Sequence, residues 1–421
     1  MSFKVSEICD INSSNLSKND KYEFINYLDT ANLTEGIISE VQYLKMDSDK
    51  IPSRAKRRVK KNDILISTVR PNQKHYGILR KTEENMIVST GFAVLTSIED
   101  KVNPEYLYRF LTQEQITQYL QAIAETSTSA YPSIRPGVIG DLEINLPPLE
   151  EQAVIANILS SLDEKIETNN QINKKLEEMA QAIFKHWFVD FEFPNEDGEP
   201  YKSSGGDMVE SELGIIPQGW EVTKINHTVE VTDYVANGSF SALKENVKTS
   251  EEIDYAMLIR LVDYNRNFKG PFTYVNEDGY KFLKKSKLFG GEIIISNVGA
   301  NAGTVFRAPR LDTPMTLGPN SIMLINNVYT NYLFYFLNSY WGQEKIKGII
   351  GGSAQPKFNK TDFRNIKLVL PQKSVINSYN LLIQPIVDKL SWLAKENQYL
   401  ELLRDALLPK LMSGEIRVPV K

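Results

Sequence analysis

Two stretches of the chain place apolar residues alternately three and four positions apart, the pattern of a helix that packs along one seam against another helix. The first stretch follows Pro147 and Pro148 and the second follows Pro371, and proline can end a strand just before a helix begins. Each predicts a helix of roughly 35–40 residues, about 55 Å long at 1.5 Å per residue. Two such helices in one chain most simply pair with each other. The seams are Leu159, Leu162, Ile166, Asn169, Asn173, Leu176, Ala180, Ile183 and Trp187, and Ile383, Ile386, Leu390, Leu393, Asn397, Leu400, Arg404, Leu407 and Leu411.

Polar residues interrupt both seams, at Asn169, Asn173, Asn397 and Arg404. A polar group in an apolar seam specifies the register of a helix pair at a cost in stability. We hypothesise that these four residues hold the two helices in one alignment. The alternative, that they face solvent or a partner protein, stays open.

The two seams are offset by 224 residues (383 − 159), and the segments before them repeat in the same order. Ser129-Ala-Tyr-Pro132 matches Ser353-Ala-Gln-Pro356 at the same offset (353 − 129), whereas earlier segments are offset by 217 (221 − 4) to 229 (292 − 63). Among these, Asp63-Ile-Leu-Ile-Ser67 and Glu292-Ile-Ile-Ile-Ser296 each predict a short buried strand. The chain is therefore interpreted as a duplication. The alternative is two unrelated α/β domains with similar strands.

These patterns predict an α+β fold with two tandem α/β domains and a pseudo-two-fold internal repeat. The first domain spans 1–148 and the second 215–372, and a polar, turn-rich linker occupies 192–214. The two long helices, at 149–191 and within 373–421 with a C-terminal tail, are expected to pair as an antiparallel coiled coil.

Composition limits the chemistry that the chain can perform. Its 421 residues exceed one ordinary core, and 42% hydrophobic and 24% charged residues are globular values. Cys9 is the only cysteine, so an intramolecular disulfide is impossible, and only three scattered histidines are present. We expect no bound metal or cofactor. With neither a leader pattern at the start nor an apolar run of about 20 residues, the chain is expected to be cytoplasmic.

Positive charge is concentrated although the net charge is −5. Asp63 is the only acid between positions 54 and 81, and a second group of lysines precedes the second Ile-Ile-Ile-Ser strand. Such clusters are typical of contacts to DNA phosphates, with a solvated helix face as the alternative for the first run. The candidates are Arg54, Lys56, Arg57, Arg58, Lys60, Lys61, Arg70, Lys74, Arg80 and Lys81, and Lys281, Lys284, Lys285 and Lys287.

Beside the Ser-Ala-x-Pro turns lie four candidates for contacts to base edges, which could equally be structural turn residues. They are Ser133 and Arg135 in the first copy and Gln355 and Lys357 in the second. We find no sequence motif that indicates a catalytic site. Asn145-Leu-Pro-Pro148 differs from the Asn-Pro-Pro-aromatic motif of amino-methyltransferases, and Gly290-Gly291 and Gly351-Gly352 lack the spacing of a phosphate-binding loop.

Four segments together resemble the specificity subunits of type I restriction-modification complexes, and the resemblance covers essentially the whole chain. They are Leu146-Pro-Pro-Leu-Glu-Glu-Gln152, Ala182-Ile-Phe-Lys-His-Trp-Phe-Val-Asp-Phe191, Ile216-Pro-Gln-Gly-Trp-Glu221 and Leu408-Pro-Lys-Leu-Met-Ser-Gly-Glu-Ile-Arg417. One departure is that the second helix begins with Pro371-Gln-Lys-Ser-Val-Ile376, without the Pro-Leu-Glu-Glu-Gln form.

The resemblance implies a non-catalytic, sequence-specific binder of double-stranded DNA. Each domain would be a target recognition domain that reads one half of a split, asymmetric site, and the helices would fix the spacer. Two methyltransferase subunits would dock on the helices and motor-nuclease subunits would join them. S-adenosylmethionine, ATP and Mg²⁺ would then belong to these partners. Two alternatives remain, a duplicated coiled-coil scaffold that does not touch DNA and an enzyme that fuses modification to recognition.

Overall fold

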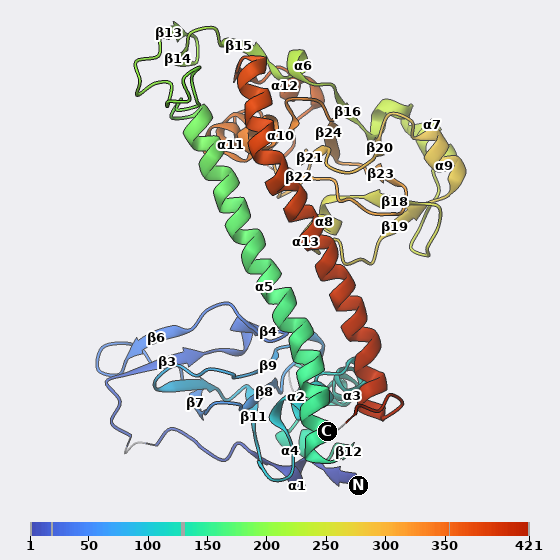
Figure 1. The fold of residues 1–421 in the computed structure, drawn as a ribbon. Coiled ribbons are helices and arrows are strands. Elements are labelled where there is room, and N and C mark those ends of the chain that lie inside the picture. The colour runs from blue at the N-terminus through green and yellow to red at the C-terminus, as the bar shows by residue number, and fades with distance from the viewer. Residues whose placement is uncertain (1, 18–19, 128–130, 353, 420–421) are drawn as a thin grey trace. The chain divides into compact units, whose positions relative to one another are not determined.

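The computed structural model describes residues 2–17, 20–127, 131–352 and 354–419. Contacts divide the chain into unit 1, which comprises Met1–Ile166 and Tyr399–Lys421, and unit 2, which comprises Glu167–Gln398. Both boundaries fall inside the long helices α5 (Leu149–Phe188) and α13 (Lys373–Ser413), shown in Figure 1. Among the described residues, no helix has the length and apolar character that a membrane crossing requires.

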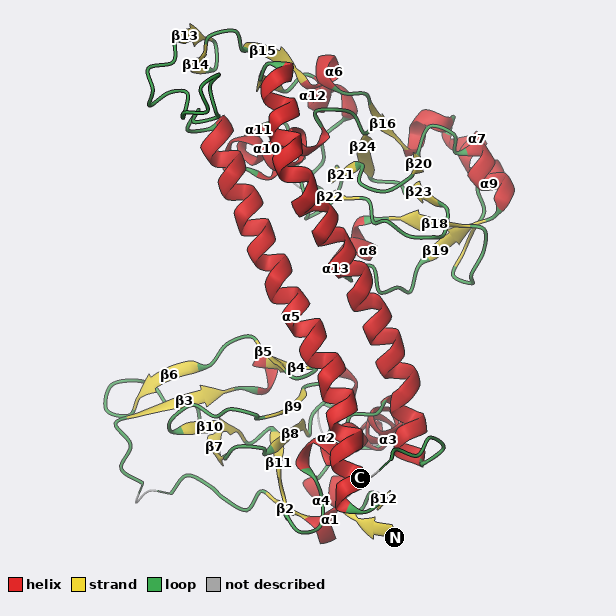
Figure 2. Ribbon diagram, in the orientation of Figure 1, coloured by secondary structure: helices red, strands yellow, loops and turns green. Residues whose placement is uncertain are grey.

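Unit 1 contains two four-stranded sheets, which Figure 2 shows in yellow. The first sheet is antiparallel with the order β2-β11-β8-β9: Cys9–Ile11, Phe92–Ser97, Ile64–Ser67 and Tyr76–Ile78. The second has the order β6-β3-β10-β7, with β3 and β10 parallel: Gln42–Lys45, Phe24–Leu28, Met86–Ser89 and Ala55–Arg58. Smaller pairs join β1 (Ser2–Lys4) to β12 (Glu143–Asn145) and β4 (Leu33–Thr34) to β5 (Ile37–Ile38).

The helices of unit 1 pack their apolar faces on one side of the first sheet, so that Ile64, Ala93, Tyr106, Leu120 and Leu159 share one core. The helical elements are α1 (Val5–Ile8), η1 (Thr30–Asn32), η2 (Pro71–Gln73), α2 (Pro104–Leu111), α3 (Glu114–Glu125) and α4 (Pro136–Gly140).

Unit 2 repeats this topology. Its antiparallel sheet has the order β16-β24-β21-β22: Val231–Asp233, Ser321–Leu324, Ile293–Ser296 and Val305–Arg307. Its second sheet has the order β17-β19-β18-β23-β20: Thr249–Ser250, Thr273–Val275, Ala256–Ile259, Met315–Leu317 and Lys287–Leu288. Here β18 and β23 are the parallel pair, as β3 and β10 are in unit 1. The other pairs are β13 (Met208–Ser211) with β14 (Gly214–Pro217) and β15 (Glu221–Lys224) with β25 (Lys367–Leu370).

The helical elements of unit 2 include α7 (Phe240–Asn246) and α9 (Glu277–Phe282), which match no described helix of unit 1. The others are α6 (Ile225–Thr228), η3 (Tyr234–Asn237), α8 (Leu261–Asn265), α10 (Thr330–Asn338), α11 (Tyr340–Lys347) and α12 (Lys360–Arg364). Helices α10, α11 and α12 correspond to α2, α3 and α4. The predicted α+β fold with an internal repeat is therefore confirmed.

Within each unit, α5 and α13 run antiparallel, as predicted. In unit 1 Asp163 of α5 pairs with Arg404 of α13, while in unit 2 Asn169 bonds to Asn397 and Trp187 contacts Tyr379. Residue numbers therefore rise along one helix as they fall along the other.

The aromatic residues of two family-like segments form part of the core of unit 2. Phe184, Trp187 and Phe188 project from α5, and Phe188 lies 6.0 Å from the ring of Trp220. Phe193, just after the helix, stacks on Trp220 at 5.0 Å. Buried aromatic rings contribute large apolar areas, so these segments hold the end of α5 against the second α/β domain.

Candidate nucleic-acid interface

The first basic run lies on an edge strand, so the helix-face interpretation is wrong. Arg54 precedes β7, which carries Lys56, Arg57 and Arg58 (Figure 2). Lys56 and Arg58 are exposed, whereas Arg57 is half-buried and donates to Asn15 Oδ1 at 2.9 Å. Burial lowers the pKa of the Arg57 guanidinium below its ordinary value. A strand that alternates buried and exposed positions thus presents two of its three cations to solvent.

The cations of unit 1 differ in how far they are already paired. Arg54, Lys56, Lys60 and Lys61 are exposed and form no ion pair with a described residue. Arg58 pairs with Asp20, and Lys74 lies 3.4 Å from Glu35 and 3.1 Å from Glu114. Arg80 pairs with Glu105. The first four are therefore the best placed to meet phosphates.

The second basic group reaches the equivalent edge strand but is displaced along it. Thr90 N donates to Arg54 O at 2.8 Å in unit 1, and the equivalent Leu317 N donates to Ser286 O at 2.8 Å in unit 2. Arg54 thus corresponds to Ser286. The cations of the first group begin at Arg54 and continue after it along the chain, whereas most lysines of the second group lie before Ser286. Only Lys287 lies in β20 itself, 4.3 Å from the centre of the Tyr280 ring.

Of the remaining lysines of the second group, Lys281 lies in the last turn of α9 and the other two follow this helix. Lys281 is paired with Glu277 at 2.8 Å. Lys284 and Lys285 are exposed in the turn that leads to β20, and within the described ranges neither forms an ion pair. The duplication preserves a basic edge strand rather than individual cations.

The proline that ends each Ser-Ala-x-Pro segment, and the residue after it, lie beside the loop that follows strand β8 in unit 1 and strand β21 in unit 2. Val69 forms a β-bridge with Ser133, and Val298 forms the equivalent bridge with Lys357. Tyr131 and Gln355, which occupy the x position of the two turns, are both exposed. Arg135 is exposed at the start of α4. Ser129 and Ser353, the first residues of the turns, lie outside the described residues.

The polar seam residues of the helix pair form two groups. In unit 2, Asn169 is fully buried, and its Nδ2 donates to Asn397 Oδ1 at 2.8 Å and to Glu396 at 2.6 Å. Asn397 Nδ2 in turn donates to Asn170. The Oδ1 atoms of Asn169 and Asn173 are both buried without a hydrogen-bond partner among the described residues. Asn173 differs in that its side chain forms no hydrogen bond to a described residue.

The second group lies in unit 1, where the Asp163 carboxylate accepts from both Arg109 and Arg404. Burial opposes the charge of Arg404, but the hydrogen bond and attraction of Asp163 outweigh it and raise the Arg404 pKa above its ordinary value. The three side chains join α2, α5 and α13 of this unit.

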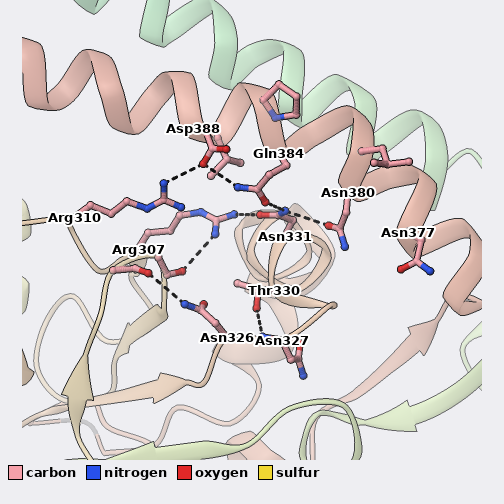
Figure 3. A pocket seen from close by; sticks show the side chains of 15 residues that line it. Arg307, Arg310, Asn326, Asn327, Thr330, Asn331, Asn377, Asn380, Gln384 and Asp388 are labelled. Atoms are coloured by element: carbon pink, nitrogen blue, oxygen red, sulfur yellow. Dashed lines mark hydrogen bonds and ion pairs between the residues drawn. The ribbon is translucent and has the colours of Figure 1, made fainter.

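A pocket of about 740 Å³ opens in unit 2 between α13, α10 and the loops around β21 and β22 (Figure 3). Arg307 donates to Asn331 Oδ1 at 2.9 Å, while Arg310 pairs with Asp388 at 3.0 Å. Burial lowers the pKa of Arg307. Six lining side chains are carboxamides: Asn326, Asn327, Asn331, Asn377, Asn380 and Gln384.

The lining of this pocket offers many hydrogen-bond donors and acceptors. Among the described residues, no cluster of three or more His, Cys, Asp or Glu side chains could hold a metal ion. Sequence reasoning missed the pocket because its walls come from segments far apart along the chain. It also did not single out Tyr131, although the repeat aligns this exposed residue with Gln355 (355 − 131 = 224).

Comparisons with known proteins agree with one another. The family model described as the type I restriction modification DNA specificity domain matches residues 1–178 and 217–401. The specificity subunit of the type I restriction enzyme HindI from Haemophilus influenzae is 27% identical over 461 residues, covering 96% of this chain and 97% of the relative. The MjaIX specificity subunit from Methanocaldococcus jannaschii is 28% identical over 368 residues, covering 85% of this chain and 78% of the relative.

A solved structure also shares the fold. The crystal structure of the type I restriction-modification S subunit from M. genitalium aligns with a TM-score of 0.58 at 15% identity, covering 98% of this chain and 95% of the other.

Proposed function

Because the chain belongs to the family of type I restriction-modification DNA specificity subunits, whose role is sequence-specific DNA recognition, we propose that each duplicated α/β domain reads one half of a bipartite, asymmetric site. The observation that carries the proposal is the repetition of both sheets, with one additional strand, β17, in the second sheet of unit 2, and with an equivalent edge strand that carries basic residues in each copy. Two copies of one recognition fold suit two half-sites better than one contiguous site.

The exposed cations on and beside β7 and β20 would contact phosphates and so position each domain without reading sequence. In unit 1 these are Arg54, Lys56, Lys60 and Lys61, and in unit 2 they are Lys284 and Lys285, beside the half-buried Lys287. In the second copy Gln355 and Lys357 are exposed beside the loop after β21, where an amide could bond to an adenine edge and an ammonium to guanine.

We propose that the helix pair fixes the spacer between the two half-sites. The buried Asn169–Asn397 bond supports one register, because sliding one helix would leave both buried amides without their partners. The ion pair between Asp163 and Arg404 is a second polar contact between the two helices, within unit 1. A fixed register would hold the spacer at one length.

Partner subunits would supply the chemistry. Helix α13 exposes large apolar side chains, including Leu381 at 81% and Leu402 at 67%, and exposed apolar residues are typical of protein-docking surfaces. We propose that methyltransferase subunits dock on the helices and that motor-nuclease subunits join them. S-adenosylmethionine, ATP and Mg²⁺ would be bound by those subunits, and this chain would perform no catalysis.

Sequencing the methylated adenines of host DNA, with and without this chain, tests the proposal. The expected motif has two short blocks separated by a fixed run of unspecified bases. A contiguous methylated motif that depends on this chain would contradict recognition by two units.

The scaffold alternative makes a different prediction for the purified chain. A protein that neutralises phosphates binds duplex DNA with an affinity that falls steeply as salt rises. A scaffold would show no salt-dependent binding to duplex DNA, and methyl transfer by the chain without a partner would support the fused-enzyme alternative.

A further inference from the structure

The loop that leaves strand β8 in unit 1 and strand β21 in unit 2 has positive φ at two equivalent positions. Two residues in each loop have positive φ: Arg70 (48°) and Lys74 (55°) in the first, Gly299 (101°) and Gly303 (96°) in the second. Both pairs align at one offset of 229 (299 − 70 and 303 − 74).

Glycine adopts positive φ freely, whereas a residue with a side chain does so at a cost. At these positions unit 2 therefore has glycines, which adopt positive φ without cost, whereas unit 1 has Arg70 and Lys74, for which positive φ is unfavourable. A strained residue persists when something else requires its side chain. For Lys74 the requirement is visible, because its ammonium lies between Glu35 and Glu114.

Arg70 has no such explanation within unit 1. Its side chain is exposed, and no ion pair joins it to a described residue. Its guanidinium lies over the ring of Tyr131, 4.9 Å from the ring centre, and Tyr131 is itself 59% exposed. The strained arginine and the exposed ring therefore form one surface feature, which we call the Arg70–Tyr131 pair.

The backbone holds the two members of this pair together. Arg70 N donates to Pro132 O at 2.9 Å, and Ile134 N donates to Thr68 O at 2.9 Å. Gly299 N makes the equivalent bond to Pro356 O in unit 2, where Gly299 and Gln355 replace the arginine and the tyrosine. The same frame thus presents different side chains in the two copies.

A guanidinium stacked on a ring by one face keeps the N–H groups of its edge available. That edge matches the O6 and N7 acceptors that guanine presents in the major groove. We propose that Arg70, oriented by Tyr131, reads a guanine in the half-site of unit 1. This inference rests on the proposed function and names one base that unit 1 recognises.

A phosphate contact would explain neither the strain nor the stacking. Phosphates accept bonds from flexible cations in many positions, and unit 1 already exposes Arg54, Lys56, Lys60 and Lys61 for that purpose. Reading a base requires a guanidinium held in one orientation, because two bonds must form to two adjacent acceptors.

The test is selection of binding sites from random duplexes by the full-length chain, followed by affinity measurements with each base at each selected position. Arg70→Gly suits the backbone, and Arg70→Lys keeps the charge but loses the planar fork. We expect the wild-type chain to prefer guanine at one position by about tenfold to a hundredfold, as a bidentate pair does. Both variants should lose that preference and keep all others. Lys56→Ala, the matched control, should weaken binding to all sequences equally.

Three results would overturn the inference: no guanine in either selected half-site, an unchanged motif with Arg70→Gly, or full discrimination with Arg70→Lys. Failure of the proposed function is separate, because the wild-type chain would then select no split motif. Thermal unfolding of Arg70→Gly at or above the wild-type midpoint checks that the loop is intact, since glycine relieves the strain.

Discussion

Units 1 and 2 share the order of their sheets, apart from the additional strand β17 of unit 2, but differ at equivalent contacts between helices and sheets. In unit 1, Glu105 of α2 pairs with Arg80, whereas the equivalent Asn331 of α10 accepts a bond from Arg307 in unit 2 (331 − 105 = 226, as for Tyr332 and Tyr106). Asp163 of α5 bridges two arginines in unit 1, and its equivalent in α13 is Val387 (387 − 163 = 224). Packing between elements has been kept, while the polar contacts have diverged.

This difference teaches which parts of a duplicated recognition protein can vary. The central strands Ile64–Ser67 and Ile293–Ser296 are buried throughout, so a change there would disturb the core. Loops such as those at Arg70 and Gly299 carry different side chains at equivalent positions outside the buried strands. A new recognition sequence would therefore arise in the loops without disturbing the sheets.

The largest loss of stability is expected at Asp163, a charged residue of unit 1 whose equivalent in α13 is Val387. Asp163→Asn removes the carboxylate that compensates Arg109, whose side chain is only 8% exposed, and Arg404. Breaking a buried pair leaves an uncompensated charge, so we expect a loss of about 3 kcal/mol in unfolding free energy by urea denaturation. Asp405→Ala, which removes an exposed partner of Arg404, should cost about 0.5 kcal/mol. Equal losses would show that Asp163 has no special role.

The two asparagines of α5 should respond in opposite directions to leucine. Asn169→Leu takes the donor from Asn397 and Glu396 and should cost about 1–3 kcal/mol. Asn173→Leu removes a buried carbonyl oxygen that has no partner in the described structure, and should be neutral or stabilising. Denaturation of both variants measures the contrast, and a larger loss for Asn173→Leu would contradict the proposed register lock.

A smaller effect is expected at Glu105. Glu105→Gln keeps the shape of the side chain but weakens its two bonds to Arg80, at 2.6 and 2.8 Å. Because the Arg80 side chain is about half exposed, we expect a loss of about 0.5–1 kcal/mol that shrinks in high salt. A salt-independent loss would point to packing instead of charge.

The smallest effect concerns single phosphate contacts. Lys56→Ala should lower the salt dependence of DNA binding by about one phosphate, whereas Lys281→Ala should change it less because Lys281 is paired with Glu277. Binding isotherms at several salt concentrations provide the slopes. Identical slopes for Lys56→Ala and the wild-type chain would remove Lys56 from the interface.

The sequence predicted elements whose signal is local or periodic. Heptad spacing marked helices of 40 and 41 residues, and the constant offset of 224 predicted the repeat. Contacts between distant segments were harder to predict from the sequence, because they depend on how strands pair and how helices pack. For the basic run at 54–61 the sequence offered a solvated helix face as the alternative to phosphate contacts, and only strand pairing excluded the helix.

The register of the helix pair was also not predicted from the sequence. The repeat aligns Asn173 with Asn397 (397 − 173 = 224), but antiparallel helices bring Asn169 against Asn397 instead. The positive φ of Arg70 likewise gave no local signal, and only comparison with Gly299 explains it.

Exchange of one domain tests the central claim most directly. Residues 1–148 would be replaced by the corresponding segment of the Haemophilus influenzae relative, and binding sites selected from random duplexes by the two chains would be compared. Recognition by two independent units predicts that one block of the motif changes while the other block and the spacer length stay the same. A change in both blocks, or in neither, would contradict it.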